Sequence, residues 1–166
     1  MIQLPEGSWW DWDVVSWDPG LLRLGAGADI SYAHGLELVF SDPVFVMCPS
    51  AFQDPTFREP TPDEVRLVAR QIGEPPAVLV AFDADAGAPA PAAALIAAAH
   101  VDIVQGLVFR YWRTPLKPSE RLAPWVHPPV EAGRLPARMH EKGPRPAQTQ
   151  GGGPLRGVAA RGFEPR

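Results

Sequence analysis

His100 and Asp102 are the residues whose types and spacing come closest to a chemical motif. Residues two positions apart on a strand project from the same face, so the imidazole and the carboxylate would lie side by side. The same spacing forms the His-x-Asp half of the facial triad that binds iron. None of the remaining histidines, His34, His127 and His140, supplies a convincing third ligand. A metal-binding protein or small enzyme centred on His100 and Asp102 is therefore our alternative hypothesis, beside the simpler interpretation of a solvent-facing polar pair.

Two pairs of carboxylates, Asp11-x-Asp13 and Asp83-x-Asp85, have the spacing with which glycosyltransferases hold a divalent cation. A magnesium ion held in this way also needs substrate phosphates and a supporting cradle of basic or backbone groups, and the sequence shows neither. Aspartate at the end of a strand also commonly begins a turn. We therefore predict no catalytic residue and no cofactor from these pairs.

Arg58 and Cys48 are two further reactive side chains to be considered. Arg58 could bind an anion, although pairing with the nearby Glu59 or Asp54 is the ordinary outcome for such a residue. Cys48 is the only cysteine and lies at the end of an apolar run. A nucleophilic thiol needs an activating cation or base, and only His34 is near in sequence. We therefore expect Cys48 to be a buried structural thiol.

Four tryptophans lie within residues 9–17, which is an unusual density. On a strand, Trp10 and Trp12 share one face, and we expect this pair to fill the core. Trp9 and Trp17 would lie at the margins of the sheet, where each could either pack against the fold or bind a partner. An acidic, tryptophan-rich edge would suit a basic protein. The candidate binding residues are Trp9, Trp17, Asp11, Asp13 and Arg58.

Charge is distributed unevenly along the chain. Residues 1–115 contain fifteen Asp or Glu, six Arg and no Lys, a net charge of −9. Residues 116–166 contain nine Lys or Arg and four Glu, a net charge of +5. An acidic domain is repelled by phosphate backbones, so nucleic-acid binding by the core is disfavoured. The field of this domain would instead attract a basic partner.

The chain also lacks the features of a secreted or membrane protein. Its N-terminus, MIQLPEGSWW, has neither the basic start nor the long apolar run of a signal peptide. The longest apolar stretches, Val78–Phe82 and Ala92–Ala99, are far shorter than the roughly 20 residues that span a bilayer. A single cysteine fits a reducing compartment. We therefore predict a cytoplasmic protein that does not bind membranes.

Alternating and continuous apolar runs predict several strands. Two turns are expected to join strands into hairpins, at Ser41-Asp42-Pro43 and at Gln105-Gly106. The proline-rich stretch 49–60 is expected to be irregular, because proline cannot donate to a ladder of backbone hydrogen bonds. The predicted strands lie at 9–18, 21–24, 29–32, 36–40, 44–48, 78–82, from about 95 to 104, and at 107–112.

The clearest local signal predicts one helix over about 61–73. Thr61 and Glu64 form a Thr-x-x-Glu capping box, and Pro62 stands at the first helical position. Gly73 is expected to end the helix in the left-handed conformation. The apolar residues between them recur at helical spacing and should face the sheet. They are Val65, Val68, Ala69 and Ile72.

The stretch SYAHGLELVF at 31–40, followed by CPSAF at 48–52 and by Phe57-Arg58, resembles a family of small uncharacterised actinobacterial proteins. Their general shape, a compact sheet with one helix, is similar to that of some immunity proteins of bacterial toxin systems. The resemblance covers about residues 9–113. It implies the architecture and, more weakly, a role in toxin neutralisation, and it assigns no functional residue.

The sequence therefore predicts an α+β fold, a mostly antiparallel β-sheet with one packed helix. Residues 1–115 would form one compact domain, and residues 116–166 a basic, disordered tail rich in proline and glycine. The predicted function is a non-enzymatic protein-binding module, immunity-like in character, that neutralises a basic partner protein.

Overall fold

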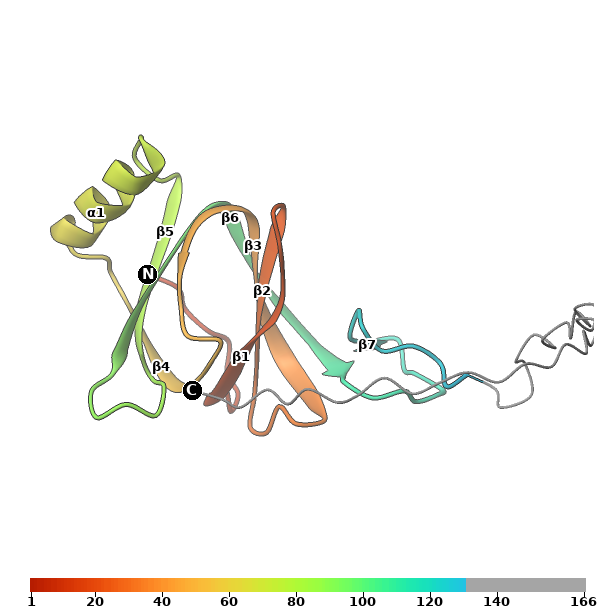
Figure 1. Cartoon of the computed structure of the whole chain (residues 1–166). Coiled ribbons are helices and arrows are strands. Elements are labelled where there is room, and N and C mark those ends of the chain that lie inside the picture. The colour runs from red at the N-terminus through yellow and green to blue at the C-terminus, as the bar shows by residue number, and fades with distance from the viewer. Residues whose placement is uncertain (131–166) are drawn as a thin grey trace, which may run out of the picture. The chain divides into compact units, whose positions relative to one another are not determined.

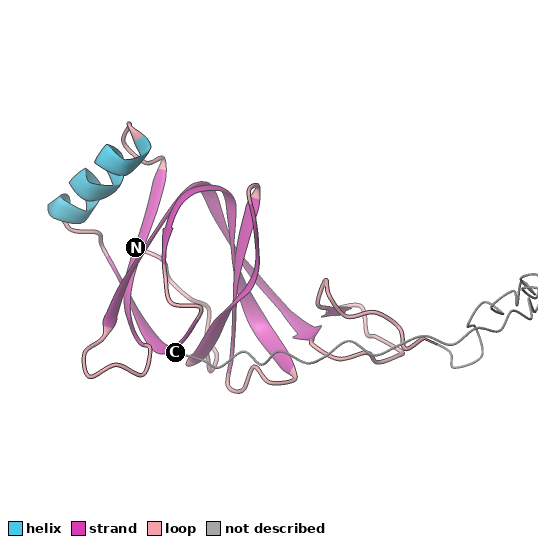
Figure 2. Cartoon of the chain, viewed as in Figure 1, coloured by secondary structure: helices cyan, strands magenta, loops and turns pink. Residues whose placement is uncertain are grey.

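A computed structural model describes residues 1–130 of the chain (Figure 1). Strands make up 52% of the described residues and helix 8%, so the predicted α+β class is wrong and the fold is mostly β (Figure 2). The elements are β1 (Asp11–Asp18), β2 (Leu21–Gly27), β3 (Ala33–Met47), β4 (Ala51–Arg58), α1 (Pro62–Ile72), β5 (Val78–Asp85), β6 (Ala92–Phe109) and β7 (Glu120–Leu122).

Six of the strands form a closed antiparallel barrel. Their order is β3-β2-β1-β4-β5-β6, and pairing of β3 with β6 closes the ring. The short strand β7 adds to β6 in parallel. Closure matters physically because it leaves no long row of unpaired backbone groups along most of the sheet. The single helix lies outside this ring (Figure 1).

Strands β3 and β6 are long and curved, and both belong to the barrel wall (Figure 1). The sequence had predicted a hairpin in place of each of these strands. Both predicted turns are instead irregularities within a continuing strand. Asp42 has a positive φ of 48°, and the pairing register shifts between Pro43 and Phe45. Gly106 has a φ of 154°, next to a second register shift opposite His34. A bulge and a tight turn draw on the same residue types, so local sequence does not distinguish them.

The segment predicted to be irregular, 49–60, contains β4. Pro55 is accommodated by a bulge, since the register of β4 with β5 shifts between Gln53 and Thr56 and Asp54 has a φ of 46°. The predicted strand at 29–32 is a turn. In β2 the strand continues to Gly27, beyond the predicted end at 24.

The barrel interior is built around aromatic rings. Trp12, Phe52 and Phe82 are almost fully buried, and the Phe82 ring lies 5.1 Å from those of both Phe52 and Phe57. Trp12 stacks on Phe52 at 5.9 Å. Trp10 was expected to share this core but precedes β1 and is 41% exposed. One tryptophan of the predicted inward pair therefore fills the core.

The predicted helix is confirmed with its caps. The Thr61 side chain accepts a hydrogen bond from the backbone N–H of Glu64, the Glu64 carboxylate accepts one from the N–H of Thr61, and Gly73 is left-handed at φ 86°. Val68 is fully buried and packs with Ala81 and Leu95 on the outside of the barrel. The amphipathic face thus seats α1 on β3, β5 and β6, as its apolar periodicity requires.

Removing the N-cap should weaken this helix measurably. Thr61→Ala deletes the acceptor for the Glu64 amide and is expected to lower the free energy of unfolding by about 1 kcal/mol. Thr61→Ser keeps the hydroxyl and should retain nearly all of that stability. Urea unfolding of both variants measures the difference. Equal midpoints for the two variants would show that the capping box does not stabilise α1.

The compact unit formed by the described residues runs from Met1 to Pro129. The sequence places the domain boundary at 115, whereas β7 at Glu120–Leu122 belongs to this unit. The rest of the predicted tail, from 131 onward, lies outside the described residues. Within residues 1–130 no helix is both long and apolar enough to cross a membrane.

Candidate functional site

A buried carboxylate organises the outer face of the barrel. Glu37 lies between Leu36 and Leu38, whose side chains fill the interior, so its own side chain points outward. It is nevertheless fully buried. The Glu37 Oε2 atom accepts hydrogen bonds from Arg23 Nη1 at 2.9 Å and lies 2.7 Å from Arg121 Nη2. A buried carboxylate is tolerated here because it is paired with two cations.

His34 extends this arrangement into a continuous network. Its Nε2 atom lies 2.8 Å from Glu37 Oε1, and its Nδ1 atom lies 3.3 Å from Nε of Arg110. The guanidinium of Arg110 also binds Asp13 through two bonds of 2.6 and 2.7 Å. We call these residues the ionic network: Asp13, Arg23, His34, Glu37, Arg110 and Arg121. No buried side-chain polar atom in residues 1–130 lacks a hydrogen-bond partner.

The neighbours of His34 determine which ring nitrogen carries the proton. The Nε group of Arg110 can only donate, so Nδ1 of His34 must accept. Nε2 of His34 must then carry the hydrogen that it donates to Glu37. Gly25 makes room for this ring, because an added Cβ there would lie 3.2 Å from His34 Cγ and 2.5 Å from Val15 Cγ2. The ring is thus held in one orientation, with Nε2 directed at Glu37 and Nδ1 at Arg110.

The charge state of Glu37 follows from the same contacts. Burial alone would raise the pKa of its carboxyl, but hydrogen bonds from His34 and Arg121, together with the charge of Arg121, outweigh it and lower the pKa to about 2. Glu37 therefore remains ionised through the whole neutral range. Its arginine partners are held in place by a permanent negative charge.

The ionic network fastens the segment after β6 to the barrel. Arg110 and Arg121 come from this segment, while Glu37 and Asp13 come from β3 and β1. Backbone bonds add to the attachment, from the N–H of Arg110 to the carbonyl of Tyr32 and from the N–H of Ala123 to that of Phe109. The position of residues 110–123 is therefore set by charged groups that β1 and β3 supply.

The attached segment completes an exposed aromatic patch, which we define as Tyr32, Tyr111 and Trp112 and which lies against the buried ring of Phe109. Tyr32 is 70% exposed, Tyr111 45% and Trp112 39%. The Tyr111 ring meets Tyr32 edge to face at 6.2 Å and Phe109 at 5.7 Å. Arg113 covers the Phe109 ring at 4.2 Å. Aromatic rings held rigidly at a surface are typical of the centres of protein interfaces.

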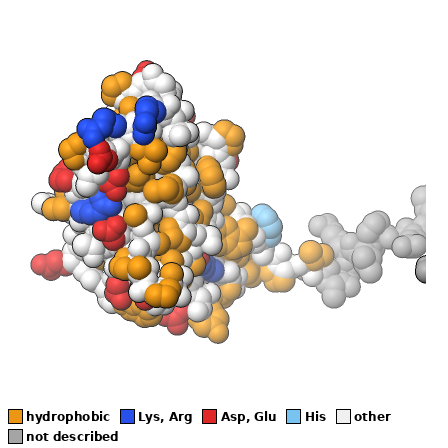
Figure 3. All heavy atoms as spheres, turned by 60° about the vertical axis from the view of Figure 1, so that its left-hand side comes forward, with side chains coloured by type: hydrophobic (Ala, Val, Ile, Leu, Met, Phe, Trp, Pro, Cys, Tyr) orange, Lys and Arg blue, Asp and Glu red, His pale blue; other side chains and the backbone are white. Residues whose placement is uncertain are grey.

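Ion pairing leaves the surface of this unit acidic. Five of the seven arginines in residues 1–130 are paired with carboxylates: Arg23, Arg58, Arg66, Arg110 and Arg121. The exposed acidic residues without an ion pair in this part of the chain are Glu6, Asp18, Asp29, Asp42, Asp54, Glu74 and Asp85. On the face in Figure 3, acidic side chains lie mainly toward the left and the lower edge, some of them beside basic ones, and hydrophobic side chains are spread over the rest.

The predicted tryptophan candidates have different environments. Trp9 is half-buried, packs against the barrel core and donates its indole N–H to the carbonyl of Pro5 at 2.8 Å. Trp17 is 63% exposed and stands beside the exposed Asp18. Only Trp17 therefore presents most of its ring to a partner. It lies at the end of β1 remote from the aromatic patch, because Trp17 pairs with Leu22 while the patch adjoins the start of β3.

The aspartate candidates are engaged within the fold. Asp11 accepts a hydrogen bond from the backbone N–H of Ile30 at 3.2 Å, and Asp13 holds Arg110. Asp83 binds Arg58 at 2.9 Å, whereas Asp85 accepts the N–H of Gly87 at the end of β5. Neither carboxylate pair converges on a common point. Their positions are explained by the local contacts of the barrel.

Arg58 joins two elements. It binds Glu64 through Nη1 and Nη2 at 2.8 and 2.7 Å, and Asp83 through Nε at 2.9 Å. The expected partners were Glu59 and Asp54, and only the backbone carbonyl of Glu59 is within reach. Hydrogen bonds from Arg58 lower the pKa of Glu64 to about 2. Arg58 thus links β4 to α1 and β5, and its donors are already used.

The His100 and Asp102 side chains do share a face, with Nε2 and Oδ1 3.0 Å apart. Both are well exposed, at 64% and 57%. Within residues 1–130 no group of three or more His, Cys, Asp or Glu side chains is placed to hold a metal.

Cys48 is half-buried, and burial raises the pKa of its thiol to about 12. Such a thiol is a poor nucleophile at neutral pH.

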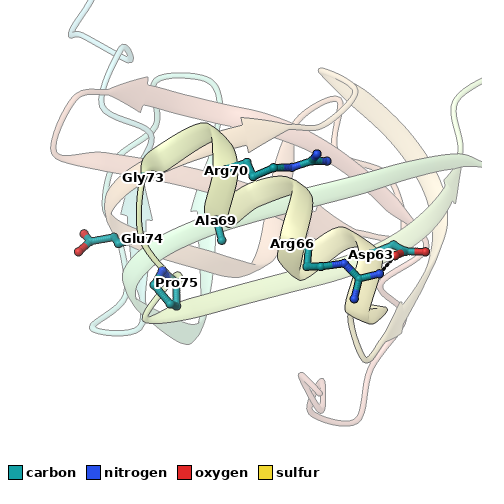
Figure 4. Close-up of a pocket in the computed structure, with 7 residues that line it drawn as sticks. All are labelled: Asp63, Arg66, Ala69, Arg70, Gly73, Glu74 and Pro75. Carbon is teal, nitrogen blue, oxygen red and sulfur yellow. Dashed lines mark hydrogen bonds and ion pairs between the residues drawn. The ribbon is translucent and has the colours of Figure 1, made fainter.

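A hollow of about 680 Å³ lies along α1 and is open to solvent (Figure 4). Arg66 in its lining is bonded to Asp63, while Arg70 and Glu74 point away from each other. Ala69, Gly73 and Pro75 complete the lining. Its polar groups do not converge on a shared point, so the hollow has no defined ligand geometry.

Reasoning from the sequence missed both the ionic network and the aromatic patch. One signal for the network was available, namely a charged residue within the apolar run at 36–40, which requires a buried partner for Glu37. Its partner Arg23 lies 14 positions earlier in the chain and its partner Arg121 lies 84 positions later. No local pattern connects these residues with Glu37. The aromatic patch was hidden for the same reason, because Tyr32 and Tyr111 meet only through pairing of β3 with β6.

Comparison of this chain with protein-family models, with curated proteins and with solved structures finds no match. The resemblance to immunity proteins and the cytoplasmic location both stay predictions.

Proposed function

We propose that this protein is a binding module that recognises a basic protein through the aromatic patch, aided by the excess of acidic side chains on the same unit. The observation that carries the proposal is the exposed edge-to-face pair of Tyr32 and Tyr111. Exposed aromatic rings that lie against one another mark interaction surfaces more often than single exposed rings do. The ionic network holds the pair in place before any partner arrives, so little ordering entropy would be lost on binding.

Charge supports the choice of a basic partner. Most arginines of residues 1–130 are neutralised by internal carboxylates, so the field outside this unit is dominated by unpaired acids. Asp29 is exposed three positions before Tyr32 and places one such acid next to the patch. Complementary charge raises the rate of encounter and excludes acidic competitors. By the resemblance to immunity proteins, the partner would be a basic toxin.

The experiment begins with capture from a native host lysate by the immobilised full chain. The captured protein is then purified and titrated against the chain by calorimetry. We expect a basic protein whose affinity falls as salt is raised, because exposed charges are screened. Replacing both tyrosines, Tyr32→Ala with Tyr111→Ala, should weaken binding by at least about tenfold, as loss of a buried aromatic anchor does.

Trp17→Ala is the matched control. It removes an equally exposed aromatic ring from the other end of β1, and should change the affinity by less than about twofold. Three results argue against the proposal: an acidic partner, binding that is indifferent to salt, or full affinity in the double tyrosine variant. A large loss for Trp17→Ala alone would move the binding surface to the tryptophan-rich end.

A further inference from the structure

One part of the barrel wall has an open backbone edge. Strand β6 pairs with β3 along almost its whole length. On its other side it pairs with β5 only as far as Ala98 and with β7 only from Leu107. Between these neighbours, the segment 99–106 has no strand partner on that side among the described residues, and no backbone hydrogen bond outside the ladders reaches it. Every second residue of the segment therefore directs its backbone N–H and C=O groups toward the open side.

The gap is bounded at both ends by the chain itself. At one end, Pro75 and Pro76 stand just before β5, which begins at Val78, and proline cannot donate to a ladder. At the other end, β7 is only three residues long and begins at Glu120. The gap between them spans roughly 27 Å of β6, at about 3.4 Å for each residue. It therefore has room for one strand of ordinary length.

The interior face of the wall is incompletely covered at this edge. Val101 and Ile103 stand opposite Phe40 and Leu38 of β3, so they belong to the face that forms the barrel core. Phe40 and Leu38 are fully buried, whereas Ile103 is 41% exposed. The difference arises because β3 has a neighbouring strand on each side and β6 lacks one here. An apolar side chain from an added strand would bury Ile103.

The outer face of the same edge carries acidic groups. Asp102 lies on this face, beside His100, and its side chain is 57% exposed. At the β5 end of the gap, Asp42 and Glu74 line a hollow next to Ala99, and both are exposed. Like charges that face each other across a strand pair are destabilising. These acids therefore exclude an acidic strand and favour a basic one.

We infer that the open edge of β6 accepts an extended segment of another protein in which basic and apolar residues alternate. The backbone of this segment continues the sheet in the place that β5 and β7 leave free. Its apolar side chains cover Ile103 on the interior face, and its basic side chains lie beside Asp102 on the outer face. The aromatic patch takes no part in this contact, so the inference does not depend on the proposed function.

Titration of the isotopically labelled full chain with synthetic peptides, followed by NMR, tests the inference. The first peptide consists of eight alternating arginine and valine residues. It should shift the amide signals of 99–106 more than any others and bind with a dissociation constant below about 1 mM. A peptide with glutamate in place of arginine keeps the apolar residues and should bind at least about tenfold more weakly. A fully N-methylated arginine–valine peptide lacks backbone donors and should not bind, because strand addition depends on main-chain hydrogen bonds.

Variants of the chain locate the contact. Asp102→Lys should weaken binding of the arginine–valine peptide by about tenfold and strengthen binding of the glutamate peptide. Asp85→Lys makes the same change of charge at the far end of β5 and should alter the affinity by less than about twofold. Tyr32→Ala with Tyr111→Ala should also leave peptide binding unchanged, which separates this edge from the aromatic patch. Asp102 is exposed, so its replacement should leave the barrel folded, as circular dichroism can show.

The inference is overturned if the arginine–valine peptide causes no shift at about 1 mM, or if its N-methylated form binds equally well. Shifts centred on the aromatic patch, or an affinity that Asp102→Lys leaves unchanged, overturn it too. Self-association of the free chain through 99–106, seen as line broadening of these amides that grows with concentration, would make a second copy the occupant and likewise contradict it.

Discussion

Replacing Glu37 by alanine should destabilise the protein by about 3 kcal/mol. The change removes the shared acceptor of Arg23, His34 and Arg121 while leaving these donors in place. His34 is fully buried and cannot turn to water, whereas the two arginines are partly exposed and can. Breaking a buried ion pair costs about 3 to 5 kcal/mol of stability. We expect the lower end of this range, because the two arginines can turn toward water. Urea unfolding followed by tryptophan fluorescence measures the loss.

Glu74→Ala is the control, because it removes an exposed acid without an ion pair in the described residues and should change stability by less than about 0.5 kcal/mol. A similar small loss for Glu37→Ala would contradict the buried network.

The same carboxylate should make the fold sensitive to acid. The pKa of Glu37 is lowered from 4.5 to about 2 on folding, so its contribution is complete above about pH 5 and is lost as the pH falls toward 2. Glu64, whose pKa is also about 2, contributes in the same direction. Glu37→Gln removes one of these two titrations. The slope of stability against pH between 5 and 2 should therefore be shallower in this variant than in the wild type.

The second large effect is expected in the barrel interior. Phe82→Ala should cost about 3 to 5 kcal/mol, because the ring is fully buried and contacts both Phe52 and Phe57. The cavity would lie beside two rings of β4, whose backbone is held by pairing with β1 and β5, so its walls cannot collapse easily. Thermal and urea unfolding give the value independently.

Phe82→Leu and Tyr32→Ala separate burial from loss of an aromatic ring. Leucine refills most of the volume at position 82 and should recover more than half of the stability. Tyr32→Ala deletes a ring that is 70% exposed and should cost less than about 1 kcal/mol. Were Phe82→Ala as mild as Tyr32→Ala, the interior would not be the packed aromatic core described above.

The helix could be predicted from sequence because all its signals are local. Thr61, Glu64 and Gly73 act on backbone groups within four residues of themselves, so their effect does not depend on the rest of the chain. The strand segments around Leu36–Phe40 and Val78–Phe82 were also predicted, since apolar, β-branched and aromatic runs favour strands wherever they pair.

The fold class could not be predicted, because it depends on which strands pair. Two residues, Asp42 and Gly106, were interpreted as turns and are instead bulges within β3 and β6. Because each site is a bulge and not a turn, each predicted hairpin becomes one long strand. The two long strands, β3 and β6, then pair and close the barrel. Nothing within a few residues of either position distinguishes the two outcomes, since the deciding contacts lie across the sheet.

The same distinction between local patterns and long-range contacts applies to the candidate site residues. The sequence correctly places His100 and Asp102 on one face, since strand alternation is local. It could not show that Asp13 and Arg58 are already engaged, because their partners Arg110 and Asp83 lie far away in the sequence. The sequence did indicate Asp83, but as half of the carboxylate pair Asp83-x-Asp85 and not as a partner of Arg58. Long-range pairing therefore decides which charged groups remain available for function.

Amide hydrogen exchange in the wild type and in Glu37→Ala tests most directly whether the ionic network holds residues 110–123, and hence the aromatic patch, on the barrel. The amides of Arg110 and Ala123, bonded to Tyr32 and Phe109, should be protected in the wild type. In Glu37→Ala they should exchange faster by at least about tenfold more than amides of β2 and β5. Equal acceleration throughout the barrel, or an absence of protection at Arg110 and Ala123 in the wild type, would contradict the account.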